Sequence, residues 1–564
     1  MISERAFLYL SFLAAAGRAA AYCNPQDVRA GLPEIVGVEY GEIKARGIEN
    51  WKAWEQTMTM PALPAEQKPL NFCEVMIAYT HPGLNDTINI SVWMPMKKED
   101  WNGRFLGQGG GGWAAGLYGD QAAAVSLGYA GAHTDAGHSI VGPPQETMIS
   151  STSWGLVSPG NVNLHALQNF AYRSLDELAT IAKKVIHTYY DKEVDYSYWQ
   201  GCSTGGRQGL ALAQRYPKQF NGILAAAPAI NWVTFLVIEI YAHVKMNELD
   251  YRPAPCELNA ITEAAIAECD EIDGVKDGVI SAADKCHFDA LSVVGQKFTC
   301  GEKGSRKITR EAAIIANAVW NGPIEDGERV WHGLSRDAAL PGLEPLFGGL
   351  ASTECDSKDK NCKSKHFAMS ADWIKTWLMK DADFDLNSID EEMFYDLLRR
   401  SYMDYDSLMD CANADLNQFK EAGGKAIMWH GLADQLIFPN GSLDYYERVS
   451  SMVPDTSDFF RYFPAPGVAH CFGGSGAFPL TAINSLVDWV EKGKAPEHLD
   501  GQVLPAPGTE STGAPATKPI CAWPKKASFI GQDPNKAASY ECSTHYAFRL
   551  KPGQTLEDVM RDEL

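Results

Sequence analysis

The sequence predicts an α/β protein whose core is a mostly parallel β-sheet and whose chain carries one large insertion. Short apolar runs alternate with helical patterns over residues 89–229, and the alternation resumes over residues 426–490. Such alternation is typical of parallel strands joined by right-handed helical crossovers. Between the two stretches, residues 230–413 are irregular in pattern and rich in Trp and Met. We therefore expect a sheet domain formed by residues 22–229 and 414–564, with an inserted lid domain at residues 230–413.

The expected elements follow one another closely along both halves of the sheet domain. Alternating or continuous short apolar runs predict strands, and apolar side chains at every third or fourth position predict helices. By these criteria strands are expected at residues 89–96, 101–106, 127–132, 196–199, 223–227, 426–430 and 459–463, and helices at 175–189, 210–216 and 483–490. No Pro-, Ser- or Gly-rich linker divides the 564 residues into equal parts, which favours one domain with an insertion.

The turn after the strand at 196–199 carries the pattern G-x-S-x-G, formed by Gly201, Ser203 and Gly205. Alone, this pattern also occurs in Gly-rich surface turns, but a strand before it and a helix after it are typical of a nucleophile elbow. The small residues allow the strained backbone that holds the serine hydroxyl free at the start of a helix. Ser203 is therefore the candidate nucleophile, and the N–H of Thr204 is a candidate donor to an oxyanion.

Four consecutive glycines, residues 109–112, follow the strand expected at 101–106. They suit either a flexible turn or a loop whose backbone approaches a ligand closely. Beside a nucleophile elbow the second interpretation is favoured, because a loop at this place supplies the second oxyanion donor. Gly110 and Gly111 are the candidates for that donor.

A nucleophilic serine needs a base, and the base needs a carboxylate that orients it. Asp434 follows the strand expected at 426–430, and His470 follows the strand expected at 459–463, which places them in the order serine, acid, histidine. We expect these two residues to complete a catalytic triad, although an ordinary loop acid and a surface histidine are the alternatives. His430 and His133 are competing bases, but neither lies in the last loop that follows a strand.

Cysteines flank two of these residues, because Cys202 precedes Ser203 and Cys471 follows His470. The arrangement Cys-Ser, Asp, His-Cys resembles the fungal tannase and feruloyl esterase family, which has bacterial relatives that cleave the monoester of terephthalate. The similarity runs from about Cys23 to the C-terminal region and includes residues 201–209 and the glycines at 109–112. It implies the α/β-hydrolase fold and a disulfide between Cys202 and Cys471.

The thirteen cysteines of the chain leave at least one thiol unpaired within it. Besides the bond just named, the resemblance implies three pairs: Cys269 with Cys286, Cys521 with Cys542, and Cys23 with Cys73. Partners cannot be assigned from the sequence to Cys256, Cys300, Cys355, Cys362 and Cys411.

An acidic segment of the insertion places Asp270, Asp273 and Asp277 close together, with glycines that allow tight turns between them. Carboxylate and carbonyl oxygens at this density suit Ca²⁺, although a solvated acidic loop is the alternative. The segment resembles the family's calcium loop, in which the matching ligands are these three carboxylates and the carbonyls of Val275 and Val279. The resemblance therefore implies a structural calcium ion.

The N-terminus indicates export. Arg5 precedes an apolar run over residues 6–16, and small residues follow at 19–21, so residues 1–21 read as a signal peptide too short to span a membrane. N-glycosylation sequons begin at Asn85, Asn89 and Asn440. The last four residues resemble an ER-retention signal, which makes the ER lumen the alternative localisation: Arg561-Asp562-Glu563-Leu564. The net charge of −22 argues against nucleic acid or an anionic membrane as a partner.

We expect a secreted carboxylic ester hydrolase of the feruloyl esterase type, acting through an acyl-enzyme on hydroxycinnamic esters, free or attached to plant polysaccharide or polyphenol. A tannase acting on galloyl esters, a catalytically silent hydrolase-fold binding protein and an ER-lumenal calcium-binding protein are the alternatives. Trp373, Trp377 and Phe384 are candidates for the aromatic wall of the substrate pocket, with the core of the lid as their other possible place.

Overall fold

The computed structural model describes residues 23–52, 68–138, 148–300, 304–343, 347–356, 361–505 and 514–544. Its largest element is a nine-stranded sheet in the order β1-β2-β3-β5-β4-β8-β9-β18-β19. The pairs from β1 to β5 run antiparallel, whereas all neighbours from β5 to β19 run parallel. The predicted α/β class with a mostly parallel sheet is confirmed.

Most strands lie within a few residues of their predicted positions: β3 (Ile88–Pro95), β4 (Arg104–Gln108), β5 (Ala130–Thr134), β8 (Tyr196–Cys202), β9 (Gly222–Ala226), β18 (Lys425–Gly431) and β19 (Phe460–Ala465). Two further strands, β1 (Glu39–Trp51) and β2 (Leu70–Thr80), were not predicted. In β1 only Ile43 is buried, so this strand lacks the apolar alternation on which strand prediction depends.

Helices cover both faces of the sheet. One face carries α7 (Ser174–Tyr190), α8 (Thr204–Arg215) and α16 (Pro439–Met452), and the other carries α3 (Gln121–Ser126) and α17 (Ala482–Lys492). Successive strand residues point to opposite faces, so Trp199 packs in the first core and Tyr198 in the second. In such a sheet ligands bind at the carboxyl ends of the parallel strands.

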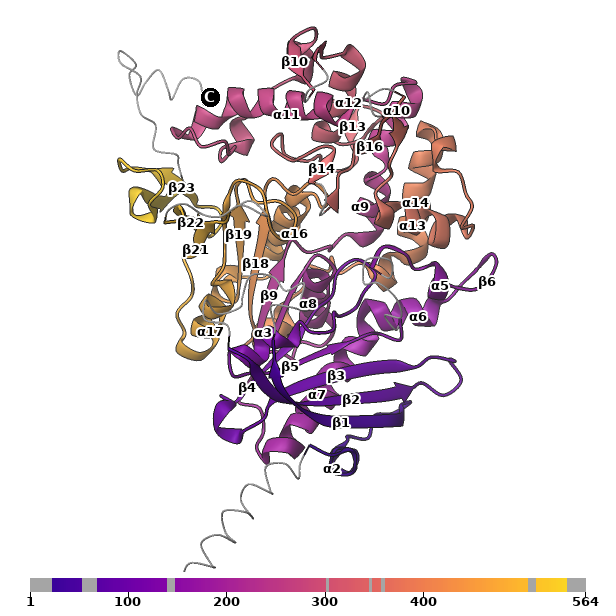
Figure 1. The fold of residues 1–564 in the computed structure, drawn as a ribbon, viewed down its shortest axis with the longest axis vertical. Helices are drawn as coiled ribbons and strands as arrows, with labels where there is room; N and C mark the ends of the chain where they lie inside the picture. The colour runs from indigo at the N-terminus through magenta and orange to yellow at the C-terminus, as the bar shows by residue number, and fades with distance from the viewer. Residues whose placement is uncertain are drawn as a thin grey trace, which may run out of the picture.

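The insertion, residues 230–413, lies between β9 and β18, which are neighbours in the sheet, and it forms the upper part of the molecule in Figure 1. It is not irregular, as its sequence pattern suggested, but largely helical: α9 (Trp232–Ile238), α10 (Tyr241–Glu248), α11 (Pro255–Cys269), α12 (Arg310–Asn321), α13 (Ala368–Asp372) and α14 (Glu391–Met409). These helices pack around a hydrophobic core that also includes side chains of the sheet domain, among them Trp113, Phe170 and Phe438. In α9 every residue except Thr234 is buried, so the helix has no amphipathic stripe by which it could be recognised.

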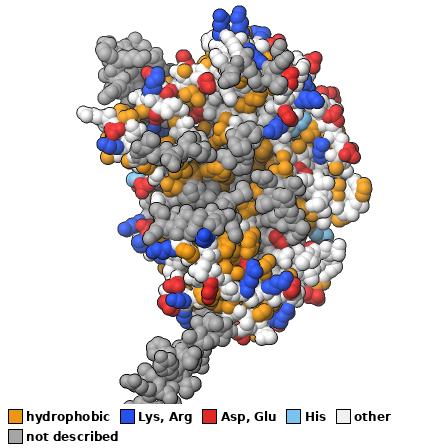
Figure 2. Space-filling model, viewed as in Figure 1, with side chains coloured by type: hydrophobic (Ala, Val, Ile, Leu, Met, Phe, Trp, Pro, Cys, Tyr) orange, Lys and Arg blue, Asp and Glu red, His pale blue; other side chains and the backbone are white. Residues whose placement is uncertain are grey.

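Short strands complete the chain beyond the main sheet: β20 (Ala477–Phe478), β21 (His498–Val503), β22 (Thr517–Cys521), β23 (Lys526–Phe529) and β24 (Tyr540–Ser543). They were not predicted either. On the face shown in Figure 2, basic and acidic side chains are interspersed, and apolar side chains gather across the middle. No helix in the described part of the chain is long and apolar enough to cross a membrane.

Six disulfides join twelve of the thirteen cysteines: Cys23–Cys73, Cys202–Cys471, Cys256–Cys300, Cys269–Cys286, Cys355–Cys362 and Cys521–Cys542. The four pairs that the resemblance implied are among them. The remaining cysteine, Cys411, is buried and unpaired.

Candidate active site

Ser203 occupies the turn between β8 and α8, at the carboxyl edge of the sheet. Its backbone has φ 60° and ψ −122°, a strained conformation that is typical of a nucleophile elbow. A Cβ atom on Gly201 would lie 2.5 Å from the backbone carbon of Gly205, so the turn closes only because Gly201 lacks a side chain. A Cβ atom on Gly205 would lie 3.0 Å from the Gly110 carbonyl oxygen, so this position also favours glycine. The Ser203 N–H donates to the Ala226 carbonyl at 3.0 Å, which ties the elbow to the next strand.

Asp434 and His470 lie on loops that follow β18 and β19, two neighbouring parallel strands. His470 Nδ1 lies 2.7 Å from Asp434 Oδ2, and the other carboxylate oxygen of Asp434 accepts the N–H groups of Leu436 and Ile437 at 2.8 and 2.9 Å. Burial alone would raise the pKa of Asp434, but the charge of His470 and hydrogen bonds from both histidines outweigh it and lower this pKa. Asp434 therefore stays ionised and can orient His470.

The competing histidines have other roles in the structure. His430 is fully buried, with Nε2 3.1 Å from Asp434 Oδ2 and Nδ1 2.8 Å from Ser442 Oγ. It is thus a second histidine in contact with Asp434, from which it is four residues away in the chain. His133 lies 2.5 Å from the Gln121 side-chain nitrogen, and burial lowers its pKa to about 4.

The disulfide between Cys202 and Cys471 joins the elbow to the histidine loop, with a Cα–Cα distance of 5.8 Å. Cys471 itself has a positive φ of 63°, and Cys202 precedes Ser203, whose φ is also positive at 60°. The neighbours of the two cysteines, Ser203 and His470, line one cavity. The structure therefore brings together all three residues predicted to form the triad.

The two predicted oxyanion loops also meet at this cavity. Thr204 is the first residue of α8, where a backbone N–H has no partner within the helix, and its side chain donates to the Gly112 carbonyl at 2.7 Å. The N–H of Gly110 donates to Gln208 Oε1 at 3.1 Å. Gly111 in turn pairs with Ala114 in an isolated antiparallel bridge, so both glycines stay candidates for the second donor.

The cavity has a volume of about 210 Å³ and mainly apolar walls. Its lining from the sheet domain includes Leu224 and Trp429, and its lining from the insertion includes Trp232, Phe235 and Met369. A flat, apolar acyl group would bury its surface there.

The prediction that Trp373, Trp377 and Phe384 line the pocket is wrong, because none of the three borders this cavity. Trp373 and Trp377 are fully buried in the core of the insertion, where their indole N–H groups donate to Ser401 Oγ and Ser151 Oγ at 2.8 and 2.9 Å. Phe384 packs against the same core. Trp232 and Phe235 of α9 take the place predicted for them.

The predicted calcium ligands are Asp270, Asp273, Val275, Asp277 and Val279, in the loop closed by the Cys269–Cys286 disulfide. Asp270 accepts the N–H groups of Asp277 and Gly278 at 3.1 and 3.0 Å, and Asp273 accepts that of Val275 at 2.9 Å. The carboxylate of Asp277 contacts the ammonium group of Lys518 on β22. The donor types fit calcium, but in the described residues no three acidic, His or Cys side chains are grouped to hold a metal ion.

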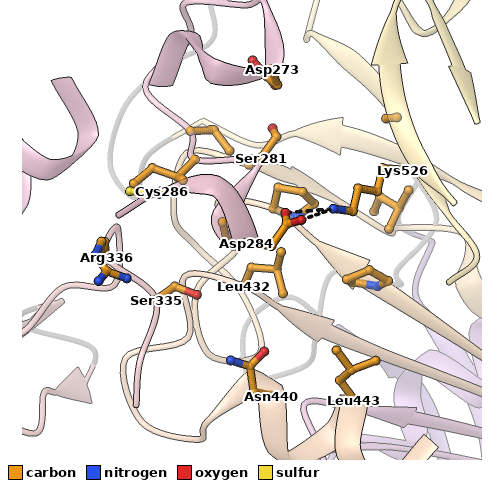
Figure 3. A pocket seen from close by; sticks show the side chains of 18 of the residues that line it. Asp273, Ser281, Asp284, Cys286, Ser335, Arg336, Leu432, Asn440, Leu443 and Lys526 are labelled. Carbon is orange, nitrogen blue, oxygen red and sulfur yellow. Dashed lines mark hydrogen bonds and ion pairs between the residues drawn. The ribbon is translucent and has the colours of Figure 1, made fainter. Parts of the chain in front are cut away.

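A second cavity, of about 410 Å³, separates this acidic loop from the C-terminal strands (Figure 3). Asp273, Asp284 and Arg336 line it from the insertion, and Lys526 lines it from β23. Lys526 Nζ is 2.8 Å from both carboxylate oxygens of Asp284. Although larger, this cavity is bordered by none of the triad candidates.

Two of the three predicted glycosylation sites are exposed, Asn85 and Asn440, the latter at the rim of the second cavity. Asn89 is half-buried, and its side-chain amide donates to Asp135 at 2.7 Å. The predicted signal peptide and the C-terminal residues 561–564 lie outside the described residues.

Known proteins share this fold and much of this sequence. The family model for tannase and feruloyl esterase matches residues 73–543. A probable feruloyl esterase of Arthroderma benhamiae is 38% identical over 498 residues, 86% of this chain and 89% of that protein. The tannase of Aspergillus oryzae is 27% identical and covers 94% of each chain. The solved tannin acyl hydrolase from Aspergillus niger has a TM-score of 0.81 at 27% identity, covering 93% of this chain and 95% of that one, which agrees with the implied α/β-hydrolase fold.

Proposed function

The chain belongs to the tannase and feruloyl esterase family, and on that premise we propose that it is a secreted serine esterase that cleaves hydroxycinnamic esters through an acyl-enzyme. Its relatives make it a carboxylic ester hydrolase for aromatic esters. The observation that carries the mechanism is that the structure brings the predicted nucleophile, base and acid to one place. His470 contacts Asp434 at 2.7 Å, and a disulfide beside it holds Ser203 in the same cavity.

In this mechanism Ser203 Oγ attacks the ester carbonyl carbon while the far nitrogen of His470 accepts the hydroxyl proton. Asp434 keeps the other imidazole nitrogen protonated and stabilises the positive charge that forms. The tetrahedral intermediate then expels the alcohol, which receives the proton from His470. Water, activated by the same histidine, hydrolyses the acyl-enzyme and releases the acid.

The negative oxygen of each tetrahedral intermediate would be held by two backbone N–H groups. Thr204 supplies one from the start of α8, and Gly110 or Gly111 supplies the other from the glycine loop. Gln208 and the Thr204 side chain brace that loop through Gly110 and Gly112. Such preorganised donors stabilise the charge without moving during the reaction.

Feruloyl esters are the first choice of substrate, because the relative from Arthroderma benhamiae, at 38% identity, is a probable feruloyl esterase. Galloyl esters are the second candidate, supported by the tannase of Aspergillus oryzae and the tannin acyl hydrolase of Aspergillus niger. Both acyl groups are flat and suit apolar walls such as Trp232 and Phe235. We propose that the ester is free or attached to plant polysaccharide or polyphenol.

Export and calcium belong to the same proposal. Twelve disulfide-bonded cysteines suit the oxidising secretory pathway, which supports export and cleavage of residues 1–21. Secretion is proposed, with retention in the ER lumen by residues 561–564 as the alternative. Glycans are proposed at Asn85 and Asn440 first, because the amide of Asn89 is already engaged. Calcium would stabilise the insertion if Asp277 exchanged its contact with Lys518 for the metal.

Hydrolysis of methyl ferulate, methyl gallate and a short aliphatic ester, measured side by side, tests the function and ranks the acyl groups. Ser203→Ala should lower turnover by several orders of magnitude without changing the melting temperature, because the covalent step is lost. Ser335→Ala, in the second cavity, is the matched control and should keep full activity. A Ser203→Ala enzyme within tenfold of wild type would overturn the mechanism. Mass spectrometry of the enzyme quenched during turnover should show the mass of the acyl group on the peptide that contains Ser203.

A further inference from the structure

Glu239, at the end of α9, is a buried carboxyl group that the mechanism does not use. It is 1% exposed, and among the described residues neither of its carboxylate oxygens has a hydrogen-bond partner. Glu239 also borders the active-site cavity. An unpartnered buried carboxyl costs free energy, so this side chain lowers the stability of the fold where it stands.

The position of Glu239 on α9 relates it to the acyl pocket. Trp232, Phe235 and Leu236 border the cavity as well, and Glu239 follows them at helical spacing on the same face of the chain. The wall that α9 contributes is therefore apolar along its length and ends in one carboxyl group. A flat acyl group that binds in this cavity would meet that carboxyl.

The protonation state of Glu239 suits a neutral ligand. Burial, reinforced by the charge of Asp434, raises the pKa of Glu239 well above its ordinary value. A protonated carboxyl donates one hydrogen bond and accepts others, as a phenolic hydroxyl also does. A ring hydroxyl would thus satisfy both groups, whereas an unsubstituted ring would leave Glu239 without a partner.

We propose that Glu239 determines specificity by hydrogen-bonding a ring hydroxyl of the acyl group, so that esters of phenolic acids are preferred over esters of unsubstituted aromatic acids. The inference rests on the proposed function, because it assigns the acyl group to the cavity beside Ser203. Discrimination by a buried polar group is large, since a substrate that lacks the hydroxyl leaves the carboxyl desolvated and unpaired.

The test compares methyl 4-hydroxycinnamate with methyl cinnamate, which differ only in the ring hydroxyl. Wild type should favour the hydroxylated ester by about 10- to 100-fold in kcat/KM, the range that corresponds to leaving one buried polar group unpaired. Glu239→Leu should remove most of this ratio through loss on the hydroxylated ester, with methyl cinnamate changed by less than about threefold. Glu239→Gln, which keeps a donor and an acceptor, should retain part of the preference.

Two controls separate this role from a structural one. Asp337 is another carboxyl group of the insertion with buried oxygens, but it does not border the active-site cavity. Asp337→Leu should therefore leave the kcat/KM ratio of the two esters unchanged. Asp120, which also borders the cavity, has one buried carboxylate oxygen without a hydrogen-bond partner among the described residues. If Asp120→Leu rather than Glu239→Leu removes the preference, the assignment to Glu239 is wrong.

The remaining outcomes are also decisive. Equal loss on both esters in Glu239→Leu, or no preference in wild type, overturns the inference while the esterase function stands. No hydrolysis of either ester by wild type overturns the proposed function itself. If Glu239→Leu fails to fold, a binding measurement replaces the kinetic test. It compares the affinities of 4-hydroxycinnamic acid and cinnamic acid for the Ser203→Ala variant and for the double variant Ser203→Ala with Glu239→Gln. The affinity ratio must then fall in the double variant.

Discussion

Removal of the Cys202–Cys471 disulfide should reduce turnover more than it reduces substrate affinity. The bond joins the residue before the nucleophile to the residue after the base, and its cysteines are 269 residues apart in sequence. In the chain-entropy estimate a loop of this length corresponds to roughly 5–6 kcal/mol of stability, an upper limit because other disulfides already restrict the unfolded chain. The double variant Cys202→Ala with Cys471→Ala should therefore unfold at lower temperature.

Loss of stability alone would not identify a catalytic role, so a second disulfide serves as the matched control. Cys256 and Cys300 lie within the insertion, 44 residues apart, and their bond corresponds to roughly 4 kcal/mol by the same estimate. Neither cysteine borders the active-site cavity. The variant Cys256→Ala with Cys300→Ala should lose comparable stability and keep its turnover number.

The assay is steady-state hydrolysis of methyl ferulate below the melting temperatures of both variants. Misplacement of a reacting group by about 1 Å can cost about 100-fold, so we expect kcat of the Cys202 and Cys471 variant to fall about 10- to 100-fold, with KM within about threefold. A kcat equal to that of the control variant would refute the positional role. Thiol labelling of denatured, non-reduced wild type should modify Cys411 alone, and labelling of Cys202 or Cys471 would refute the bond itself.

Three further predictions concern groups around the site and the insertion. His430→Phe should lower kcat about tenfold with little change in KM, because Asp434 loses a hydrogen-bond partner that holds its orientation; unchanged kinetics would contradict this. Chelation of calcium should lower the melting temperature of wild type, and Lys518→Gln should enlarge this effect because the lysine no longer competes with the metal for Asp277. If the chelator changes the melting temperature of neither protein, the calcium site is excluded. Burial keeps the pKa of His243 well below its ordinary value, so at low pH the unfolded chain binds a proton at this residue that the folded chain does not. The free energy of unfolding should therefore fall as the pH drops below about 6.5, by up to about 1.4 kcal/mol per pH unit. His243→Phe should flatten this loss in denaturant titrations at pH 7 and pH 5, and parallel curves for both proteins would argue against it.

The elbow could be predicted from the sequence because its geometry is local. The spacing of Gly201, Ser203 and Gly205 between a strand and a helix dictates the backbone within five residues, without help from distant parts of the chain. The order of Ser203, Asp434 and His470 could be predicted as well, because each follows a strand whose apolar pattern is visible. Parallel strands then bring those loops to one edge of the sheet.

Contacts between distant segments could not be predicted in this way. The aromatic residues of the insertion are similar in type, yet Trp232 borders the cavity, while Trp373 and Trp377 lie in the hydrophobic core of the insertion. Which of them borders the cavity depends on how α9 packs against the π-helical segment Trp373–Met379, which follows α13, since a buried helix shows no polar face that would orient it. The pairing of Cys256 with Cys300 likewise depends on where two loops meet.

The sequence by itself determined the fold class, the nucleophile with its elbow, and the order of the acid and base, because these depend on patterns within a few residues of the chain. Only the tertiary structure decided the partners of buried polar groups. His430 contacts Asp434, Lys518 contacts Asp277, and Glu239 borders the cavity beside Ser203 without a partner among the described residues. The physical reason is that a buried charge or hydrogen-bonding group is defined by what surrounds it. Lys518 and Asp277 come from segments 241 residues apart, whereas His430 and Asp434 are four residues apart and meet through the turn that follows β18.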